Sequence, residues 1–194
     1  MEFQSTITKE EINKLDLKKC EGSIELIDQE DQIAPAFEII NKYEYAGFDT
    51  ETKPVFVKGQ YNHISLIQIS VPGHTFLIRT SILGVSDEVC DFFENENILK
   101  LGVALADDIK ELRKLREFTP RAFYEINELV KGIGIESNGL RNLTATILGF
   151  RISKNAQVSN WEAPVLEDRQ IDYAATDSWV CLEMYEKLTK LKLL

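Results

Sequence analysis

The amino-acid sequence predicts an α/β fold in which a mixed β-sheet is flanked by helices. Two observations support this class. Three strand-like runs follow one another at residues 45–50, 63–69 and 75–78, and beyond residue 85 helical and strand-like segments alternate. Three successive antiparallel strands followed by β–α units are typical of a mixed sheet. No internal repeat, low-complexity tract or Gly/Ser-rich linker interrupts the pattern, so we expect one domain over residues 1–194.

The first part of the chain is expected to lead into the three antiparallel strands. A Thr-x-x-Glu pattern beginning at Thr8 is typical of a helix start, and alternation over residues 23–28 indicates a strand. Residues 30–43 have apolar positions at helical spacing and lead directly into the strand at 45–50. The turn Val71-Pro72-Gly73 then joins the second and third strands of the group as a hairpin.

The second part of the chain is expected to complete the sheet and cover it. Residues 98–103 and 122–126 read as strands, each preceded by a helical pattern. The predicted helices cover residues 85–95, 106–117, 125–131, 139–148 and 167–191. The last is the longest, and its small residues Ala174 and Ala175 would let it approach the sheet closely.

Composition limits the classes of function. The net charge is −10, from 22 basic and 32 acidic residues, which opposes non-specific binding of nucleic acid unless a cleft holds basic residues or divalent cations. The three cysteines are odd in number and widely spaced, which argues against disulfides or a zinc site and favours the cytoplasm. The sequence contains no membrane-spanning run and starts with a polar segment, so we expect no membrane association.

Asp49 and Glu51 raise the first functional question. They end an apolar strand and are two residues apart, so their side chains share one face of the sheet, where like charges repel. A cation between them would relieve the repulsion. Taken alone, however, the pair fits a solvated strand end better than a metal site.

Further carboxylates occur in two later segments. Asp107 and Asp108 lie at a predicted helix start, where capping is the simplest explanation, although one of them could reach toward Asp49. Tyr173 and Asp177 are four residues apart on one face of the last helix. If all three segments converge, the four acids require cations, and their oxygen atoms suit Mg²⁺ or Mn²⁺. Two such ions about 4 Å apart can activate water for phosphodiester hydrolysis.

These three segments, in this order, resemble the exonuclease motifs of the DEDDy 3′–5′ exonucleases. That group belongs to the ribonuclease-H-like superfamily and includes ribonuclease D and the Werner syndrome protein exonuclease. The matching runs are Phe48-Asp49-Thr50-Glu51 with Leu66-Ile67-Gln68-Ile69, Gly102-Val103 with the following acidic pair, and Tyr173-Ala174-Ala175-Thr176-Asp177. The segment between the second and third motifs is also similar, and the resemblance covers residues 22–192, the expected core of the domain.

The resemblance implies a role for each matching residue. Asp49, Glu51 and Asp177 would hold a first divalent metal ion, and Asp49 would also contact a second ion that Asp108 supports. Asp107 is then the helix cap. Tyr173 would orient the attacking water; with an ordinary pKa near 10 it would be a weak base at neutral pH. Candidate substrate-binding residues are Thr50, Lys154 and Trp161, although Trp161 also fits packing under the last helix.

The implied activity is metal-dependent 3′–5′ exonuclease cleavage of DNA or RNA that has a free 3′ end, releasing nucleoside monophosphates. The acidic charge leaves a second hypothesis open: a non-catalytic nucleic-acid or protein-binding module that keeps the fold. A third is a phosphohydrolase of small nucleotides. The low content of basic residues also suggests that a protein partner could supply a basic surface.

Overall fold

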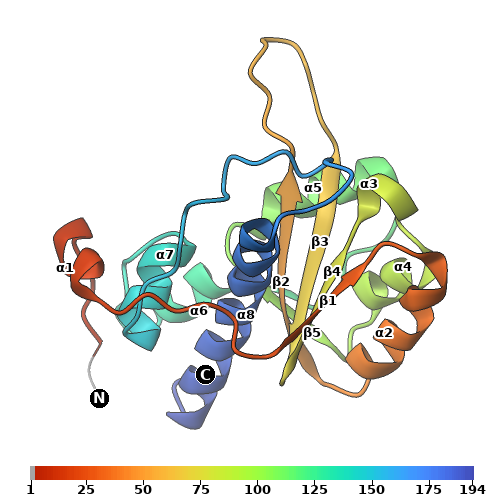
Figure 1. Cartoon of the computed structure of the whole chain (residues 1–194). Coiled ribbons are helices and arrows are strands. Elements are labelled where there is room, and N and C mark those ends of the chain that lie inside the picture. The colour runs from red at the N-terminus through yellow and green to blue at the C-terminus, as the bar shows by residue number, and fades with distance from the viewer. Residues whose placement is uncertain (1–2) are drawn as a thin grey trace.

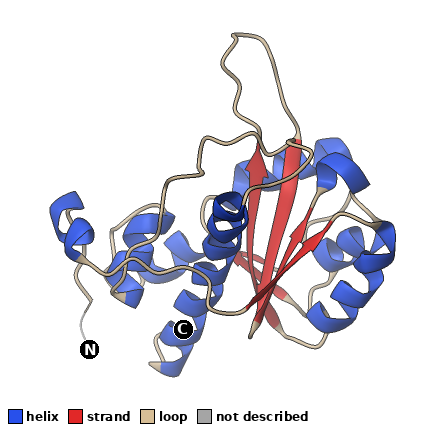
Figure 2. Cartoon of the chain, in the orientation of Figure 1, coloured by secondary structure: helices blue, strands red, loops and turns tan. Residues whose placement is uncertain are grey.

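A six-stranded mixed β-sheet organises the chain, as the computed structural model of residues 3–194 shows (Figures 1 and 2). The strands stand in the order β1-β4-β3-β2-β5-β6. β3 pairs antiparallel with both β2 and β4, as predicted, whereas β1 runs parallel to β4 and the β2-β5-β6 side is parallel. The strands are β1 Ser23–Ile27, β2 Tyr45–Thr52, β3 Ile64–Val71, β4 His74–Ile78, β5 Leu99–Gly102 and β6 Phe123–Glu125.

Helices cover both faces of the sheet. α8 packs on β2 and β3 on one face, and α2 and α4 lie on the other (Figure 1). The helices are α1 Lys9–Lys14, α2 Ile33–Ile40 after a 3₁₀ turn at Glu30–Gln32, α3 Thr80–Leu83, α4 Asp87–Glu94, α5 Leu105–Leu115, α6 Ile126–Lys131, α7 Leu140–Leu143 and α8 Asp168–Lys190. In the described part of the chain, no helix is both long and apolar enough to cross a membrane.

The strands and most helices agree with the predicted segments, and three details differ. The helix expected over residues 139–148 is divided, because a π-helical turn at Thr144–Leu148 follows α7. Gly149, with φ 80°, closes that turn in a left-handed conformation that suits glycine. The helix expected over residues 30–43 ends at Ile40, and the short helix α3 had no counterpart in the prediction.

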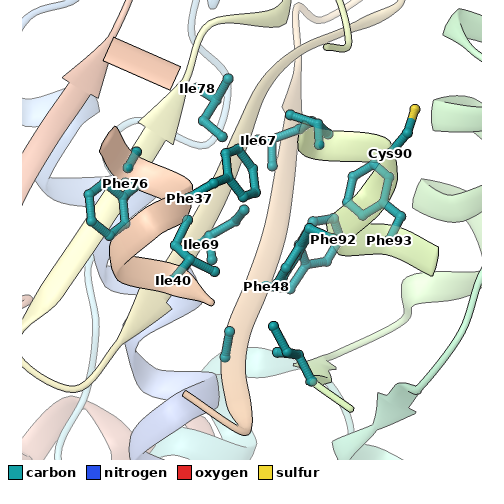
Figure 3. Close-up of a cluster of buried hydrophobic side chains, with 14 of the residues drawn as sticks. Phe37, Ile40, Phe48, Ile67, Ile69, Phe76, Ile78, Cys90, Phe92 and Phe93 are labelled. Atoms are coloured by element: carbon teal, nitrogen blue, oxygen red, sulfur yellow. The ribbon is translucent and has the colours of Figure 1, made fainter. Parts of the chain in front are cut away.

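One hydrophobic core fills the space between the sheet and helices α2 and α4. Phe48 of β2 lies edge-on against Phe93 of α4, with ring centroids 5.7 Å apart, and Phe37 of α2 lies against Phe92 (Figure 3). Every residue of β3 is buried, because helices cover both faces of this strand. The sequence of β3 is therefore mostly apolar, without the alternation of a strand that has one solvent-facing side. Its antiparallel pairing with β2 sets the register of β2 in the sheet.

The opposite face holds α8 unusually close to β2. A Cβ atom built on Gly47 would lie 2.0 Å from the backbone oxygen of Ser178 in α8, so only glycine fits there. Ala174 and Ala175 are fully buried on this face, and the hydroxyl groups of Ser70 and Ser178 join across the interface at 2.7 Å. This contact brings the acidic residues of α8 to the end of β2.

Candidate active site

The C-terminal end of β2 forms the floor of a pocket of about 430 Å³. Asp49, Thr50 and Glu51 all line it, and a register shift between Glu51 and Thr52 ends the regular pairing with β3 there. The backbone N–H of Thr50 donates a 2.9 Å hydrogen bond to Oδ1 of Asp49, which fixes that carboxylate against its own strand. The predicted shared face of the two acids therefore opens into a cavity.

α8 supplies the second side of the pocket. Tyr173 and Asp177 line the cavity from one face of the helix, one turn apart. Asp177 is only 5% exposed although it carries a carboxylate. A carboxylate this deeply buried requires a polar or ionic partner, and the Tyr173 hydroxyl one turn away supplies a hydrogen bond.

Asp108 approaches from the first turn of α5. Its Oδ1 accepts a hydrogen bond from the Thr50 hydroxyl, which ties the third acidic segment directly to β2. Asp107 is exposed and the expected capping role for it is wrong, because α5 has no side-chain cap from that residue. Instead, the carboxylate of Glu125 at the end of β6 accepts hydrogen bonds from the N–H groups of Ala104 and Leu105.

Burial of the carboxylates is the main cause of their pKa shifts, and mutual repulsion adds to it for Asp49 and Glu51. Burial raises the pKa of Asp49 well above its ordinary range, and the charges of Asp177 and Asp108 raise it further. Burial followed by repulsion from Asp49 raises the pKa of Glu51 to about 10. Burial also raises the pKa of Asp177, although the Tyr173 hydroxyl partly offsets this, and it raises the pKa of Asp108 to about 6. No basic side chain is among the causes of these shifts, so no nearby cation within residues 3–194 compensates the charge of the cluster.

A polar wall faces the carboxylates across the pocket. It consists of residues around α7 and the segment after the π-helical turn, and it carries two basic side chains, Arg141 and Lys154. Lys154 forms no ion pair in the described part of the chain. Three amide side chains of this wall were not predicted from the sequence as site residues: Asn138, Asn142 and Gln157. The only signal available was their position in a stretch without acidic residues.

The N-terminal segment holds this wall in place. Backbone N–H groups of Glu136 and Ser137 donate to the Ser5 carbonyl oxygen at 2.8 and 3.0 Å. The Arg141 guanidinium donates to Oδ1 of Asn13 at 2.9 Å. A parallel bridge between Leu17 and Arg151 continues the contact. Residues 5–17 therefore hold the basic wall in position, and we call this segment the N-terminal strap.

Trp161 cannot stack on a base in this conformation. Its side chain is 0% exposed and packs in a hydrophobic cluster with Ala174 and Trp179 of α8. Its ring lies 6.2 Å from the ring of Tyr173. The substrate-binding role is therefore corrected: Trp161 supports Tyr173 from below, which agrees with the packing alternative drawn from the sequence.

Gln68 is a further buried polar residue beside the acids. It is the direct cross-strand partner of Asp49, so both side chains project from the same face of the sheet. Gln68 is fully buried, and within residues 3–194 neither polar atom of its amide has a hydrogen-bond partner. Burying two unpaired polar atoms lowers the stability of the fold. An uncommon feature of this kind beside Asp49 is consistent with a functional site there.

The donor set fits hard divalent cations. Four carboxylates converge without a basic partner, and oxygen-only ligands suit Mg²⁺ or Mn²⁺ better than zinc. The side chains nevertheless do not form a closed site, because among the described residues no group of three or more His, Cys, Asp or Glu is arranged as a ready-made metal site. The chemistry of the residues therefore fits metal ions, although the described side chains are not arranged as a complete ligand set.

Comparison with known proteins decides the family. A family model described as 3′–5′ exonuclease matches residues 24–192, nearly the whole chain. The chain belongs to the 3′–5′ exonuclease family. Among its relatives are the human exonuclease mut-7 homolog, 27% identical over 183 residues, and the mouse bifunctional 3′–5′ exonuclease/ATP-dependent helicase WRN, 30% identical over 157 residues. These alignments cover 78% and 76% of this exonuclease chain, but 20% and 11% of the relatives.

Solved structures confirm the ribonuclease-H-like fold. The Nibbler EXO domain of Aedes aegypti superposes with a TM-score of 0.78 at 23% identity, covering 90% of this chain and 94% of that one. Ribonuclease D of Escherichia coli gives a TM-score of 0.76 at 24% identity, covering 87% of this chain and 44% of that one. The family match and the sequence relatives, which include a ribonuclease D and WRN, confirm the resemblance to the ribonuclease D and Werner exonuclease group. The exonuclease domain spans 20–40% of the length of its first three curated relatives.

Proposed function

We propose that this domain is a metal-dependent 3′–5′ exonuclease that removes nucleoside monophosphates from the 3′ end of DNA or RNA. The observation that carries the proposal is the convergence of Asp49, Glu51, Tyr173 and Asp177 on one pocket, with Asp108 tied to it through Thr50. Membership of the exonuclease family supports the reaction class. The basic wall opposite the acids offers a place for the phosphates of the substrate.

In this proposal the carboxylates hold two divalent metal ions. Asp49, Glu51 and Asp177 would hold the first ion, and Asp49 with Asp108 would hold the second. When bound, the ions supply a hydroxide nucleophile and stabilise the leaving oxygen. Without metal ions, burial and, to a smaller extent, repulsion from Asp49 favour protonation of Glu51, whose pKa is raised to about 10. Cation binding and protonation therefore compete for the same oxygen atoms.

Tyr173 acts as a hydrogen-bonding group and not as a base. Burial raises the pKa of its phenol far above the ordinary value, and the charges of Asp177 and Glu51 raise it further. The hydroxyl therefore keeps its proton at neutral pH and can orient a water molecule or a phosphate oxygen. The buried Trp161 ring beneath Tyr173 limits the positions that the phenol can adopt.

Substrate binding is assigned to the opposite wall and to Thr50. Lys154, which has no ion pair among residues 3–194, suits a phosphate, while Thr50 acts mainly by positioning Asp49 and Asp108. The acidic remainder of the chain gives little help, so a protein partner with a basic surface fits the proposal. A cytoplasmic location, suggested by three free buried cysteines, stays a prediction.

The test uses 5′-labelled single-stranded DNA, recessed duplex DNA and single-stranded RNA, each with Mg²⁺, Mn²⁺ or EDTA. We expect a metal-dependent ladder that shortens from the 3′ end and disappears with Asp49→Asn. The matched control is Asp107→Asn, which removes an exposed carboxylate next to Asp108 and should leave activity unchanged.

A second readout separates the proposal from a non-catalytic module. Mn²⁺ should raise the melting temperature of the wild type, because a cation that binds the folded state stabilises it, and should raise that of Asp49→Asn much less. Intact labels in every lane, together with no shift on adding metal, would overturn the proposal in favour of a binding module that keeps the fold.

A further inference from the structure

Two long segments of this acidic chain contain no acidic residue. Residues 52–86 lack Asp and Glu, and so do residues 137–161, although the chain as a whole has a net charge of −10. The first segment begins directly after Glu51, and the second supplies the basic wall of the pocket. Because acidic surface repels phosphates, these segments mark the approach to the pocket that a polynucleotide can tolerate.

The two segments meet beside the pocket and form a groove of about 370 Å³. The loop between β2 and β3 projects beyond the sheet, and the segment before α8 passes its base (Figure 1). The groove adjoins the pocket along both segments, because Glu51 and Gln157 line the pocket while Lys53, two residues after Glu51, and Val158, the residue after Gln157, line the groove. Its lining consists of Lys53, Pro54, Phe56, Val57, Gln60, Asn62, Val158, Ser159 and Asn160.

The chemistry of the groove suits unpaired bases. Phe56 is 82% exposed, and within the described residues its ring contacts no other ring and no cation. Val158 on the opposite side is also exposed, and the side-chain amides of Gln60 and Asn160 can donate and accept hydrogen bonds. Apolar surface left in water next to amides is typical of a binding surface.

The loop is braced so that Phe56 stays exposed. The Asn62 amide donates to the Lys53 carbonyl oxygen at 2.9 Å across the base of the loop. The Lys53 ammonium lies 2.8 Å from a carboxylate oxygen of Glu162, which joins the two walls of the groove. A hydrogen bond between the ends of the turn at residues 57–60 closes the tip. These contacts restrict the loop that carries Phe56, which lowers the conformational entropy lost when a ligand binds.

We propose that this groove binds the single-stranded part of a polynucleotide just upstream of its 3′ end, with Phe56 stacking on an unpaired base. The inference rests on the proposed exonuclease function, because it places the 3′ end in the adjoining pocket. It also selects the form of the substrate. Stacking requires a base whose face is free, and in a duplex both faces are covered by neighbouring base pairs.

Binding is measured by fluorescence anisotropy in the Asp49→Asn background, so that turnover cannot interfere. The probes are a labelled 12-nucleotide DNA strand, the same sequence as RNA, and a blunt DNA duplex. We expect Phe56→Ala to weaken binding of the single strands about tenfold, the usual effect of losing one base–aromatic stack. Phe56→Trp should restore it, and duplex binding should not change. The DNA and RNA arms show which sugar the groove accepts.

Two controls make the result specific. Tyr124→Ala removes an exposed aromatic ring from the edge strand β6 and should bind like the parent. In the active protein, Phe56→Ala should raise KM for the 12-mer about tenfold and leave cleavage of a dinucleotide unchanged, because two nucleotides do not reach the groove.

The outcomes separate this inference from the proposed function. If the wild type cleaves and Phe56→Ala binds the 12-mer as tightly as its parent, the groove proposal is overturned while the exonuclease proposal stands. If no protein cleaves any substrate, the exonuclease proposal fails, and anisotropy still decides whether the groove binds single strands. Tight capture of the duplex that depends on Phe56 would also overturn the inference.

Discussion

Gly47→Ala is the sharpest test of how this fold builds its pocket. The added Cβ would lie 2.0 Å from the Ser178 backbone oxygen and 2.9 Å from the Leu182 backbone nitrogen. Real Cβ contacts start at about 3.0 Å, so α8 must retreat from β2 by at least 3.0 − 2.0 = 1.0 Å. Both obstructing atoms belong to helix backbone, which cannot turn aside as a side chain can. We therefore expect a loss of more than about 3 kcal/mol in the free energy of unfolding.

The same retreat should reduce activity, because Ser178 follows Asp177. A displacement of about 1 Å between Asp177 and Asp49 is enough to lower kcat on the order of 100-fold. Urea denaturation followed by circular dichroism measures the stability, and single-turnover cleavage of a labelled strand measures the rate.

A matched control is available at Gly132, the residue after α6. Its φ of −61° suits alanine, and the nearest atom to an added Cβ, the Leu129 backbone oxygen, is 3.8 Å away. Gly132→Ala should therefore be neutral or stabilise the fold by about 0.4–1 kcal/mol. If Gly47→Ala stays within 1 kcal/mol of the wild type and keeps full activity, the close contact of α8 with β2 does not govern the pocket.

Three further changes test other parts of the structure. Burial lowers the pKa of Lys100 to about 8, so the unfolded chain binds more protons between pH 8 and 10.5 and stability rises with pH across that window. Lys100→Met should remove this rise and stabilise the fold at pH 7 by about 1–3 kcal/mol; an unchanged pH profile of the melting temperature would contradict the reasoning. Glu125→Gln should cost about 1–2 kcal/mol in urea denaturation, because the start of α5 loses a charged cap; no change would show that water replaces it. Gln68→Leu should raise the melting temperature by removing two unpaired polar atoms from the interior, and a drop would indicate that the amide has a partner such as a bound water.

The sequence was sufficient for those features that depend on neighbouring residues. β2 and β3 were predictable because continuous apolar runs bounded by turn residues indicate strands buried on both faces. The common direction of Asp49 and Glu51 followed from the two-residue period of a strand, and that of Tyr173 and Asp177 followed from the helical period. The fold class required no more than the order of these elements.

Features that depend on contacts between distant segments could not be predicted. The place of β1 beside β4 is set by tertiary packing, because a parallel edge strand has no local signature. The cap on α5 comes from Glu125, which reaches the helix from another strand, so the nearby Asp107 was the wrong choice. The burial of Trp161 could not be predicted either, because a tryptophan that follows Ser and Asn can lie on the surface or in the interior of a protein.

The N-terminal strap has a practical consequence for anyone who shortens this protein. The family match begins at residue 24, yet Ser5, Asn13 and Leu17 hold the wall that carries Arg141. A truncation designed from sequence similarity would keep Asp49, Glu51, Asp108 and Asp177 and still lose the N-terminal contacts that hold the basic wall. Such a fragment should fold and bind metal but have a lower affinity for its substrate. An activity assay on the fragment would therefore underestimate the activity of the intact domain.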